Sequence, residues 1–210
     1  MRDRCLRCLR PTTFCCCREL APIPSQTRVV ILQHPREARL AICSAWLAHV
    51  ALPSSEIHQG VSFERNERVL ALAATTGAAL LYPGPDATPA ATAEPPPLLF
   101  VVDGTWPQAV KMLRDSPTLS ALPRISVAPT GPGAYGDLRR EPGPEHLSTI
   151  EAIALALGTL ERAPERFAPM CAAFRRSVAL QLECARGESR NPRHRPARGR
   201  RPRDASGNTR

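Results

Sequence analysis

The stretch that decides the fold runs from Leu98 to Leu113 and reads LLFVVDGTWPQAVKML. Its first five residues are apolar without alternation, which is typical of a strand buried on both faces of a parallel sheet. The run ends at Asp103, and a helical pattern follows, with Thr105 as the N-cap and Gln108 as its capping-box partner. We therefore expect an α/β fold in which Asp103, Thr105 and Trp106 lie at the carboxyl end of a buried strand. Open α/β sheets bind their ligands at that place.

Further apolar and helical runs predict a mostly parallel sheet with flanking helices. One helix start is explicit, because Ser148 and Glu151 form an S-x-x-E capping box before an apolar helical pattern. Expected strands cover 28–33, 79–82, 98–102 and 124–128; expected helical segments cover 37–49, 68–74, 148–160 and 164–185; expected loops cover 85–97 and 130–144.

Composition limits the class of protein. The chain has 210 residues, enough for one α/β domain with a single core. Its formal charge is +9, and residues 186–210 hold nine arginines and only two acidic residues. This segment is poor in apolar residues, so we expect a basic disordered tail and an anionic partner. No secretory signal and no run near 18 apolar residues is present, so we expect a cytoplasmic protein without a membrane span. No obligate protein partner is evident.

The N-terminus is rich in cysteine. Cys5 and Cys8 form a C-x2-C pair, and Cys15 and Cys17 form a C-x-C pair around Cys16. In a reducing compartment such crowding indicates a metal site, and four thiolates satisfy the tetrahedral preference of Zn²⁺. Cys16 could replace either neighbour as a ligand. We expect a structural zinc knuckle and link over residues 1–25, whose folding energy comes from the metal.

The residues Asp103-Gly-Thr-Trp106 resemble the D-x-T-W signature of the DTW-domain family of tRNA-uridine aminocarboxypropyltransferases. The resemblance continues, in the family's order, through three further segments and the N-terminal cysteines, from about residue 5 to 165. The family's C-x2-C-x6-C-x-C pattern favours Cys15 and Cys17 over Cys16 as ligands. The three segments read ILQHPRE at 31–37, LYPG at 81–84 and LSTIEA at 147–152.

The resemblance implies an activity for a catalytic domain over residues 26–185. The family uses S-adenosylmethionine as the donor of a 3-amino-3-carboxypropyl group, which goes to N3 of a tRNA uridine and leaves methylthioadenosine. The family is related to SPOUT-type methyltransferases, so the resemblance also implies a SPOUT-like parallel α/β fold, in which a C-terminal knot can occur. The chain has no G-x-G-x-x-G or P-loop sequence, which argues against ordinary dinucleotide or nucleotide-triphosphate binding.

The same resemblance suggests roles for individual side chains. Asp103 is the candidate general base, and the rival role for it is a hydrogen bond or electrostatic contact to the donor or to uridine. Trp106 could stack on adenine or uridine. Arg139 and Arg140 could hold the donor's carboxylate or a tRNA phosphate. The other candidate residues of the donor pocket are Thr105, Ser148, Thr149 and Glu151.

Two other functions compete with aminocarboxypropyl transfer at this point. A related fold could transfer the methyl group of the same donor to RNA. A zinc-containing RNA-binding adaptor without catalysis would also suit the cysteines and the basic tail, although it does not require the Asp103–Trp106 sequence. The mass of the tRNA nucleosides after incubation with the donor distinguishes all three.

Overall fold

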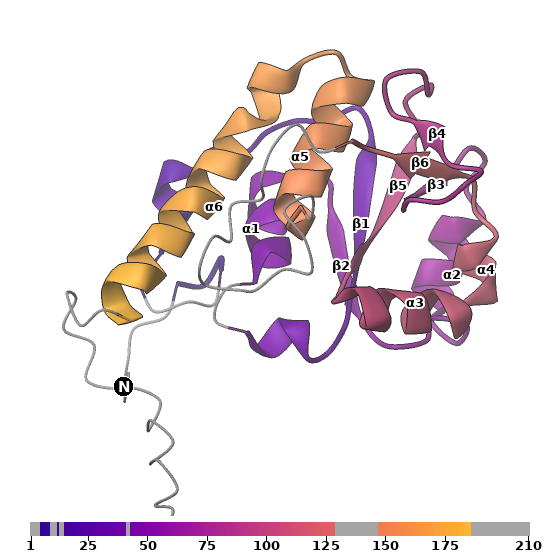
Figure 1. Ribbon diagram of the computed structural model, residues 1–210, viewed down its shortest axis with the longest axis horizontal. Helices are drawn as coiled ribbons and strands as arrows, with labels where there is room; N and C mark the ends of the chain where they lie inside the picture. Colours follow the sequence, from indigo (N-terminus) through magenta and orange to yellow (C-terminus); the bar gives the residue numbers. More distant parts are fainter. Residues whose placement is uncertain (1–4, 9–11, 13–14, 41–42, 129–146, 186–210) are drawn as a thin grey trace, which may run out of the picture.

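The computed structural model describes residues 5–8, 12, 15–40, 43–128 and 147–185, and it confirms the α/β class (Figure 1). Within these residues six parallel strands form one sheet in the order β2-β1-β5-β3-β6-β4. The strands are β1 (Arg28–Gln33), β2 (Glu56–Gln59), β3 (Ala79–Leu81), β4 (Thr88–Pro89), β5 (Leu98–Asp103) and β6 (Arg124–Ser126). The helices are η2 (Cys17–Glu19), η3 (Glu37–Arg39), α1 (Ser44–Ala51), α2 (Glu67–Ala73), α3 (Trp106–Arg114), α4 (Pro117–Ser120), α5 (Thr149–Leu160) and α6 (Pro164–Ala185).

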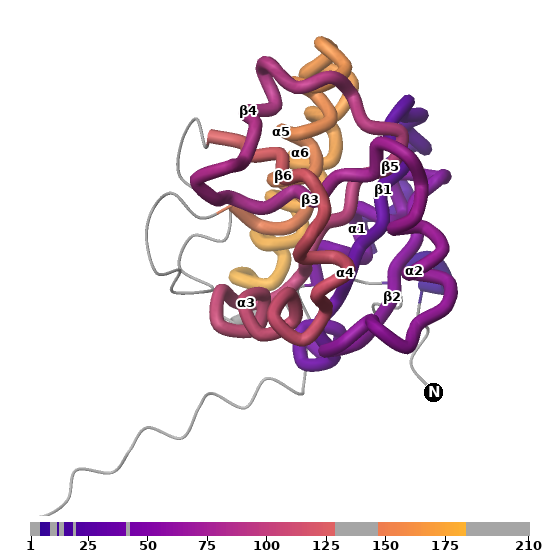
Figure 2. The backbone as a smooth tube through the Cα atoms, turned by 90° about the vertical axis from the view of Figure 1, so that its right-hand side faces the viewer, coloured from indigo at the N-terminus to yellow at the C-terminus, as the bar shows by residue number. Residues whose placement is uncertain are grey.

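Helices cover both faces of the sheet, which explains why its central strands lack alternation. Along β5, Leu99 and Val101 belong to the apolar cluster with α1, α5 and α6. Leu98 and Phe100 belong to the cluster on the opposite face, which also contains residues of α2, α3 and α4. Figures 1 and 2 show α5 and α6 together on one side and α2 and α4 on the other.

The carboxyl ends of the first three strands lie in register. Gln33, the last residue of β1, is paired with Gln59 of β2 on one side and with Asp103 of β5 on the other. The chain continues from this edge into η3, and the backbone N–H of His34 donates to the carbonyl oxygen of Asp103 at 2.8 Å. Asp103 therefore lies at the centre of the sheet's carboxyl edge.

Three expectations about the elements were wrong in detail. Strand β2 was missed because it contains a single apolar residue, Ile57, as an edge strand can. The expected loop 85–97 contains the two-residue strand β4, which pairs with β6 at the other edge. The expected helix 37–49 is interrupted, because Leu40 has extended backbone angles and closes the short 3-10 helix η3.

The N-terminal link is attached to the core of the sheet domain. Leu20 and Ile23 are buried in the apolar cluster that contains α1, α5 and α6, and the Ile23 N–H donates to the Ala51 carbonyl at 2.7 Å. Among the described residues, no helix is long and apolar enough to cross a membrane. The expected loop 130–144 and the basic tail 186–210 lie outside the described residues.

Candidate active site

Asp103 is buried at the end of β5 and accepts hydrogen bonds at both carboxylate oxygens. The residue is 6% exposed. Its Oδ2 accepts from Gln33 Nε2 at 2.8 Å, and its Oδ1 accepts from the hydroxyl of Thr149. Thr149 is the first residue of α5 and lies 46 positions further along the chain. The carboxylate thus joins the central strand to the helix that covers it.

Gln33 extends this network across the carboxyl edge of the sheet. Its side chain is fully buried, and Nε2 also lies 3.0 Å from the sulfur of Cys43, just before α1. Its Oε1 accepts from Gln59 Nε2 at 3.3 Å. The amide of Gln33 is therefore fixed in one orientation, with its nitrogen toward Asp103. Sequence reasoning missed Gln33 and Gln59, although each ends a strand at the edge where ligands bind.

Two helices begin beside Asp103, and both begin with a capping box, as predicted. At the start of α3, Gln108 Oε1 accepts from the Thr105 backbone N–H at 2.7 Å. At the start of α5, Glu151 Oε2 accepts from the Ser148 N–H at 3.0 Å and from the Ser148 hydroxyl at 2.6 Å. The positive ends of both helix dipoles are thereby directed toward the edge that holds the Asp103 carboxylate.

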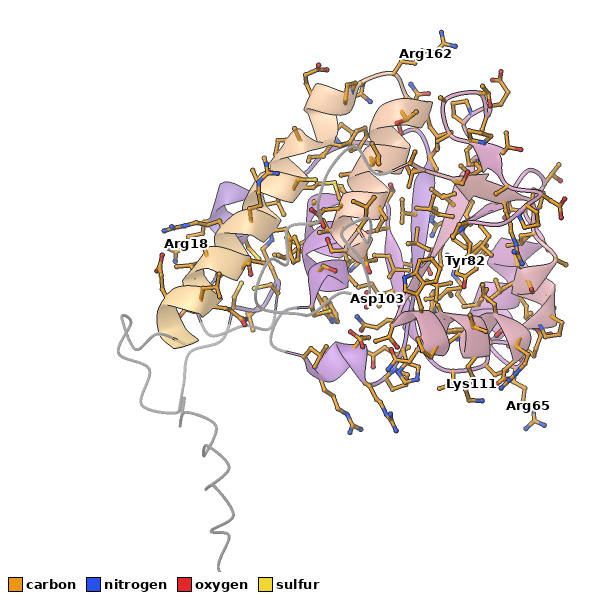
Figure 3. The ribbon with its side chains drawn as sticks, in the orientation of Figure 1. Arg18, Arg65, Tyr82, Asp103, Lys111 and Arg162 are labelled. Carbon is orange, nitrogen blue, oxygen red and sulfur yellow. The ribbon has the colours of Figure 1, made fainter. Side chains whose placement is uncertain are left out.

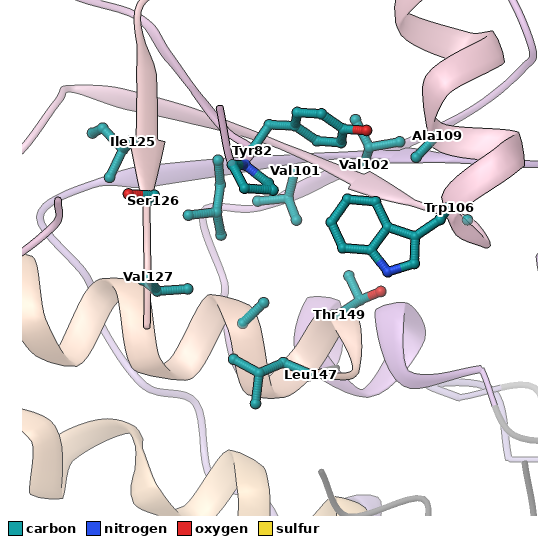
Figure 4. Close-up of a pocket in the computed structure, with 14 residues that line it drawn as sticks. Tyr82, Val101, Val102, Trp106, Ala109, Ile125, Ser126, Val127, Leu147 and Thr149 are labelled. Atoms are coloured by element: carbon teal, nitrogen blue, oxygen red, sulfur yellow. The ribbon is translucent and has the colours of Figure 1, made fainter. Parts of the chain in front are cut away.

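A pocket of about 400 Å³ opens at the carboxyl ends of β3, β5 and β6 (Figure 4). Trp106 is 42% exposed at its wall, and its ring centroid lies 5.8 Å from that of Tyr82. The Arg124 guanidinium lies over the Tyr82 ring, 5.5 Å from its centroid. Burial raises the pKa of Tyr82. The remaining lining is mainly aliphatic: Leu81, Pro83, Val101, Val102, Gly104, Ala109, Ile125, Ser126, Val127, Leu147, Thr149 and Ala152.

The predicted site residues fall into three groups. Trp106 and Thr149 line the pocket, and Asp103 lies directly behind Thr149. Thr105, Ser148 and Glu151 form the helix caps just described and are not part of the described pocket lining; Glu151 instead lines a separate hollow between α5 and α6. Arg139 and Arg140 lie outside the described residues.

Tyr82 and Arg124 were missed as site residues. Tyr82 follows β3 directly and belongs to the quoted LYPG segment, so its position at a strand end was the available signal. Val110 of α3 is apolar but 53% exposed. The buried positions of α3 are Ala109, Met112 and Leu113, because a helix turns by about 100° per residue and Val110 points away from this set.

The N-terminal cysteines converge as a metal site requires. The sulfurs of Cys5, Cys8, Cys15 and Cys17 all lie within 4.8 Å of one another, and Cys8 and Cys15 are 3.7 Å apart. Tetrahedral ligands about 2.3 Å from zinc are separated by roughly 3.8 Å, so the arrangement fits one ion. Cys16 is buried but is not a member of this group.

The pKa values of two cysteines in the cluster are shifted in opposite directions. A hydrogen bond from the backbone of Cys8 lowers the pKa of Cys5 to about 6. Burial raises the pKa of Cys17. A bound divalent cation would offset this cost, because a coordinated thiol is deprotonated. The four side chains can therefore hold zinc with no open coordination position for chemistry.

The fold and site together define an α/β protein with an open pocket at the carboxyl edge of a parallel sheet, beside a buried carboxylate. The model of the DTW domain matches residues 2–182, and the chain belongs to this family. A Drosophila melanogaster protein named tRNA-uridine aminocarboxypropyltransferase 2 is 33% identical over 177 residues, covering 78% of this chain and 69% of the relative.

Two further relatives carry similar names. The Mus musculus tRNA-uridine aminocarboxypropyltransferase 2 is 30% identical over 77% of this chain, which spans only 57% of the mouse protein. The Arabidopsis thaliana tRNA-uridine aminocarboxypropyltransferase A is 28% identical over 76% of this chain and 73% of its own length. No solved structure matches the chain.

Proposed function

We propose that this protein transfers the 3-amino-3-carboxypropyl group of S-adenosylmethionine to N3 of a tRNA uridine and releases methylthioadenosine. Family membership and the names of the relatives support transfer to a tRNA uridine. The observation that carries the proposal is the Asp103–Thr149 pair, which brings a buried carboxylate into contact with a hydroxyl on the wall of the pocket that Trp106 and Tyr82 also line.

The reaction needs alignment and the removal of one proton. The uridine N3–H loses its proton, N3 bonds to the methylene carbon next to the sulfonium, and the carbon–sulfur bond breaks with its electron pair going to sulfur. The sulfonium is already an activated leaving group, so no residue has to protonate it. Positioning the two reactants can supply on the order of 7–11 kcal/mol.

The pocket suits the adenosyl part of the donor. Trp106 and Tyr82 offer an aromatic wall on which adenine can stack, and the aliphatic lining suits the apolar parts of the donor. The Ser148–Glu151 cap fixes the start of α5, whose free N–H groups suit the carboxylate of the donor. We assign Arg139 and Arg140 to that carboxylate or to a tRNA phosphate.

Thr149 and Asp103 are our candidates for proton removal. A hydroxyl has one proton and two lone pairs, and Thr149 gives its proton to Asp103. Its lone pairs are therefore available to accept the uridine N3–H. As N3 attacks carbon, its proton passes to the Thr149 oxygen while the Thr149 proton passes to Asp103. A positioned base of this kind contributes roughly 10²–10⁴-fold. Zinc held by the four cysteines would stabilise the N-terminal fold and takes no part in this step.

Mass spectrometry of tRNA nucleosides tests the proposal directly. Full-length protein is incubated with unmodified tRNA and S-adenosylmethionine labelled either in the aminocarboxypropyl chain or in the methyl group. We expect a uridine that gains the aminocarboxypropyl label alone, together with methylthioadenosine. Gain of the methyl label would instead show a methyltransferase. tRNA binding without any covalent change, in protein that also binds the donor, would favour the adaptor function.

A further inference from the structure

The short helix η3 presents two arginines to solvent beside the candidate active site. Arg36, its N-cap, and Arg39, its last residue, are both exposed, whereas Glu37 between them is buried. In a 3-10 helix the side chains at i and i+3 lie on the same side, and the Arg39 N–H donates to the Arg36 carbonyl in this pattern. The outer face of η3 therefore carries two guanidinium groups and not the intervening carboxylate.

These two charges differ from those cations of the described surface that are held in ion pairs. Lys111 and Arg114 of α3 both contact Asp115, so one of their two charges is balanced locally. Arg28 and Arg68 likewise share Glu56. Within the described ranges, Arg36 and Arg39 have no carboxylate within ion-pair distance, so their hydrogen-bonding capacity is available to an external anion.

The position of η3 points to a ligand of the same site. The N–H of His34 donates to the Asp103 carbonyl, and Arg36 follows only two residues later, within about 7 Å of His34 along the chain. In Figures 1 and 3 the η3 turn lies at the same end of the sheet as Asp103 and α3. An arginine side chain from η3 can thus reach the surroundings of a nucleotide whose base lies at the pocket.

We propose that Arg36 and Arg39 form a phosphate clamp for tRNA, binding the backbone next to the uridine that enters the pocket. This inference rests on the proposed function for the identity of the nucleic acid. The shared chemistry is recognition of an anionic oxygen, which could also belong to the donor's carboxylate. Exposure favours phosphate, because both arginines face solvent and neither belongs to the described pocket lining. Planar guanidinium groups bind phosphate oxygens in pairs.

Equilibrium binding of a tRNA transcript at several salt concentrations, without donor, tests the clamp. Each neutralised phosphate adds about 0.7 to 0.9 to the slope of log affinity against log salt, which is roughly 5- to 8-fold in affinity at 0.1 M salt. The variant Arg36→Gln/Arg39→Gln should therefore bind about 25- to 60-fold more weakly at 0.1 M salt, with a slope shallower by about 1.4 to 1.8. Arg36→Lys/Arg39→Lys keeps the charge and should keep the slope.

The matched control is Arg18→Gln/Arg162→Gln, which also removes two positive charges but at exposed positions away from Asp103 (Figure 3). We expect a clearly smaller loss of affinity for this control. Donor affinity, measured by calorimetry, should be unchanged in the glutamine variant of η3. A loss of donor affinity instead of tRNA affinity would assign η3 to the donor's carboxylate and overturn the clamp.

The clamp and the proposed function can fail separately. Equal tRNA affinity and slope in wild type and in the glutamine variant, or wild-type protein that does not bind tRNA, would overturn the clamp even where transfer is observed. A clamp with the expected salt behaviour in a protein that transfers no aminocarboxypropyl group would leave the inference standing and overturn the proposed function. The melting temperature of each variant confirms that the fold is intact.

Discussion

Replacing Asp103 by asparagine separates the proton-accepting role of this residue from its contacts. The substitution keeps the shape of the side chain and leaves one oxygen that can accept from Thr149. An amide cannot take up the proton that Thr149 would pass on, so the relay stops. We expect the rate of transfer to fall by about 10²–10⁴-fold, which corresponds to roughly 3–5 kcal/mol in activation free energy.

The same substitution has a structural cost that can be worked out from the hydrogen bonds. Gln33 Nε2 donates to Asp103 Oδ2, and the Thr149 hydroxyl donates to Oδ1. If the asparagine oxygen stays with Thr149, the asparagine NH₂ group faces the NH₂ group of Gln33. Gln33 cannot simply rotate its amide, because Oε1 accepts from Gln59. A buried donor without an acceptor costs about 1–3 kcal/mol. Each kcal/mol lowers the melting temperature of a domain of this size by roughly 2–4 °C.

The assay measures transfer in a single turnover with saturating enzyme and donor, beside donor affinity and melting temperature. Thr149→Ser, which keeps the hydroxyl, should retain most of the rate, whereas Thr149→Val should lose it to a similar extent as Asp103→Asn. A rate for Asp103→Asn within about threefold of wild type, with weakened donor binding, would refute proton acceptance by Asp103 and support the contact role instead.

Three further outcomes are expected. Trp106→Ala should weaken donor binding by roughly 3- to 10-fold, the value of one aromatic contact at a partly exposed position, as calorimetry would detect. Purified protein should hold about one zinc per chain by elemental analysis, and Cys8→Ser should lower that content while Cys16→Ser should not. Ion pairs lower the pKa of Glu56 to about 2, so its stabilising effect is present above pH 4.5 and is lost as pH falls toward 2. Glu56→Gln should therefore make the free energy of unfolding, measured with urea, depend less steeply on pH between 4.5 and 2. An unchanged pH dependence would contradict this.

Local signals were enough to predict the elements that carry the site. The apolar run of β5, the capping box at Thr105 and the capping box at Ser148 are each complete within a few residues, so the sequence predicted them correctly. Strand β2 lacks such a signal, because it is an edge strand held by backbone pairing to β1 and by one apolar side chain.

The partners of Asp103 could not be predicted in the same way. Gln33 lies 70 positions from Asp103 and Thr149 lies 46 positions from it, so their contacts depend on strand order and on which helix covers which face. The pattern of apolar residues indicates that a strand is buried, but it does not indicate which elements bury the strand. The contact between Tyr82, which follows β3, and Arg124 of β6 was missed for the same reason, since it depends on the strand order that places β3 between β5 and β6.

Side-chain alternation explains why the acidic residue of the D-x-T-W sequence occupies this position in the strand. Alternate residues of a strand point to the same face, so Asp103 continues the row of Leu99 and Val101, which pack in the cluster that contains α5. A carboxylate one position earlier, at Val102, would point to the opposite face. Gln33 continues the matching row of β1 and is paired with Asp103 in register. The position of Asp103 in β5 therefore determines that it meets the first residue of α5, and with it the hydroxyl at the pocket wall.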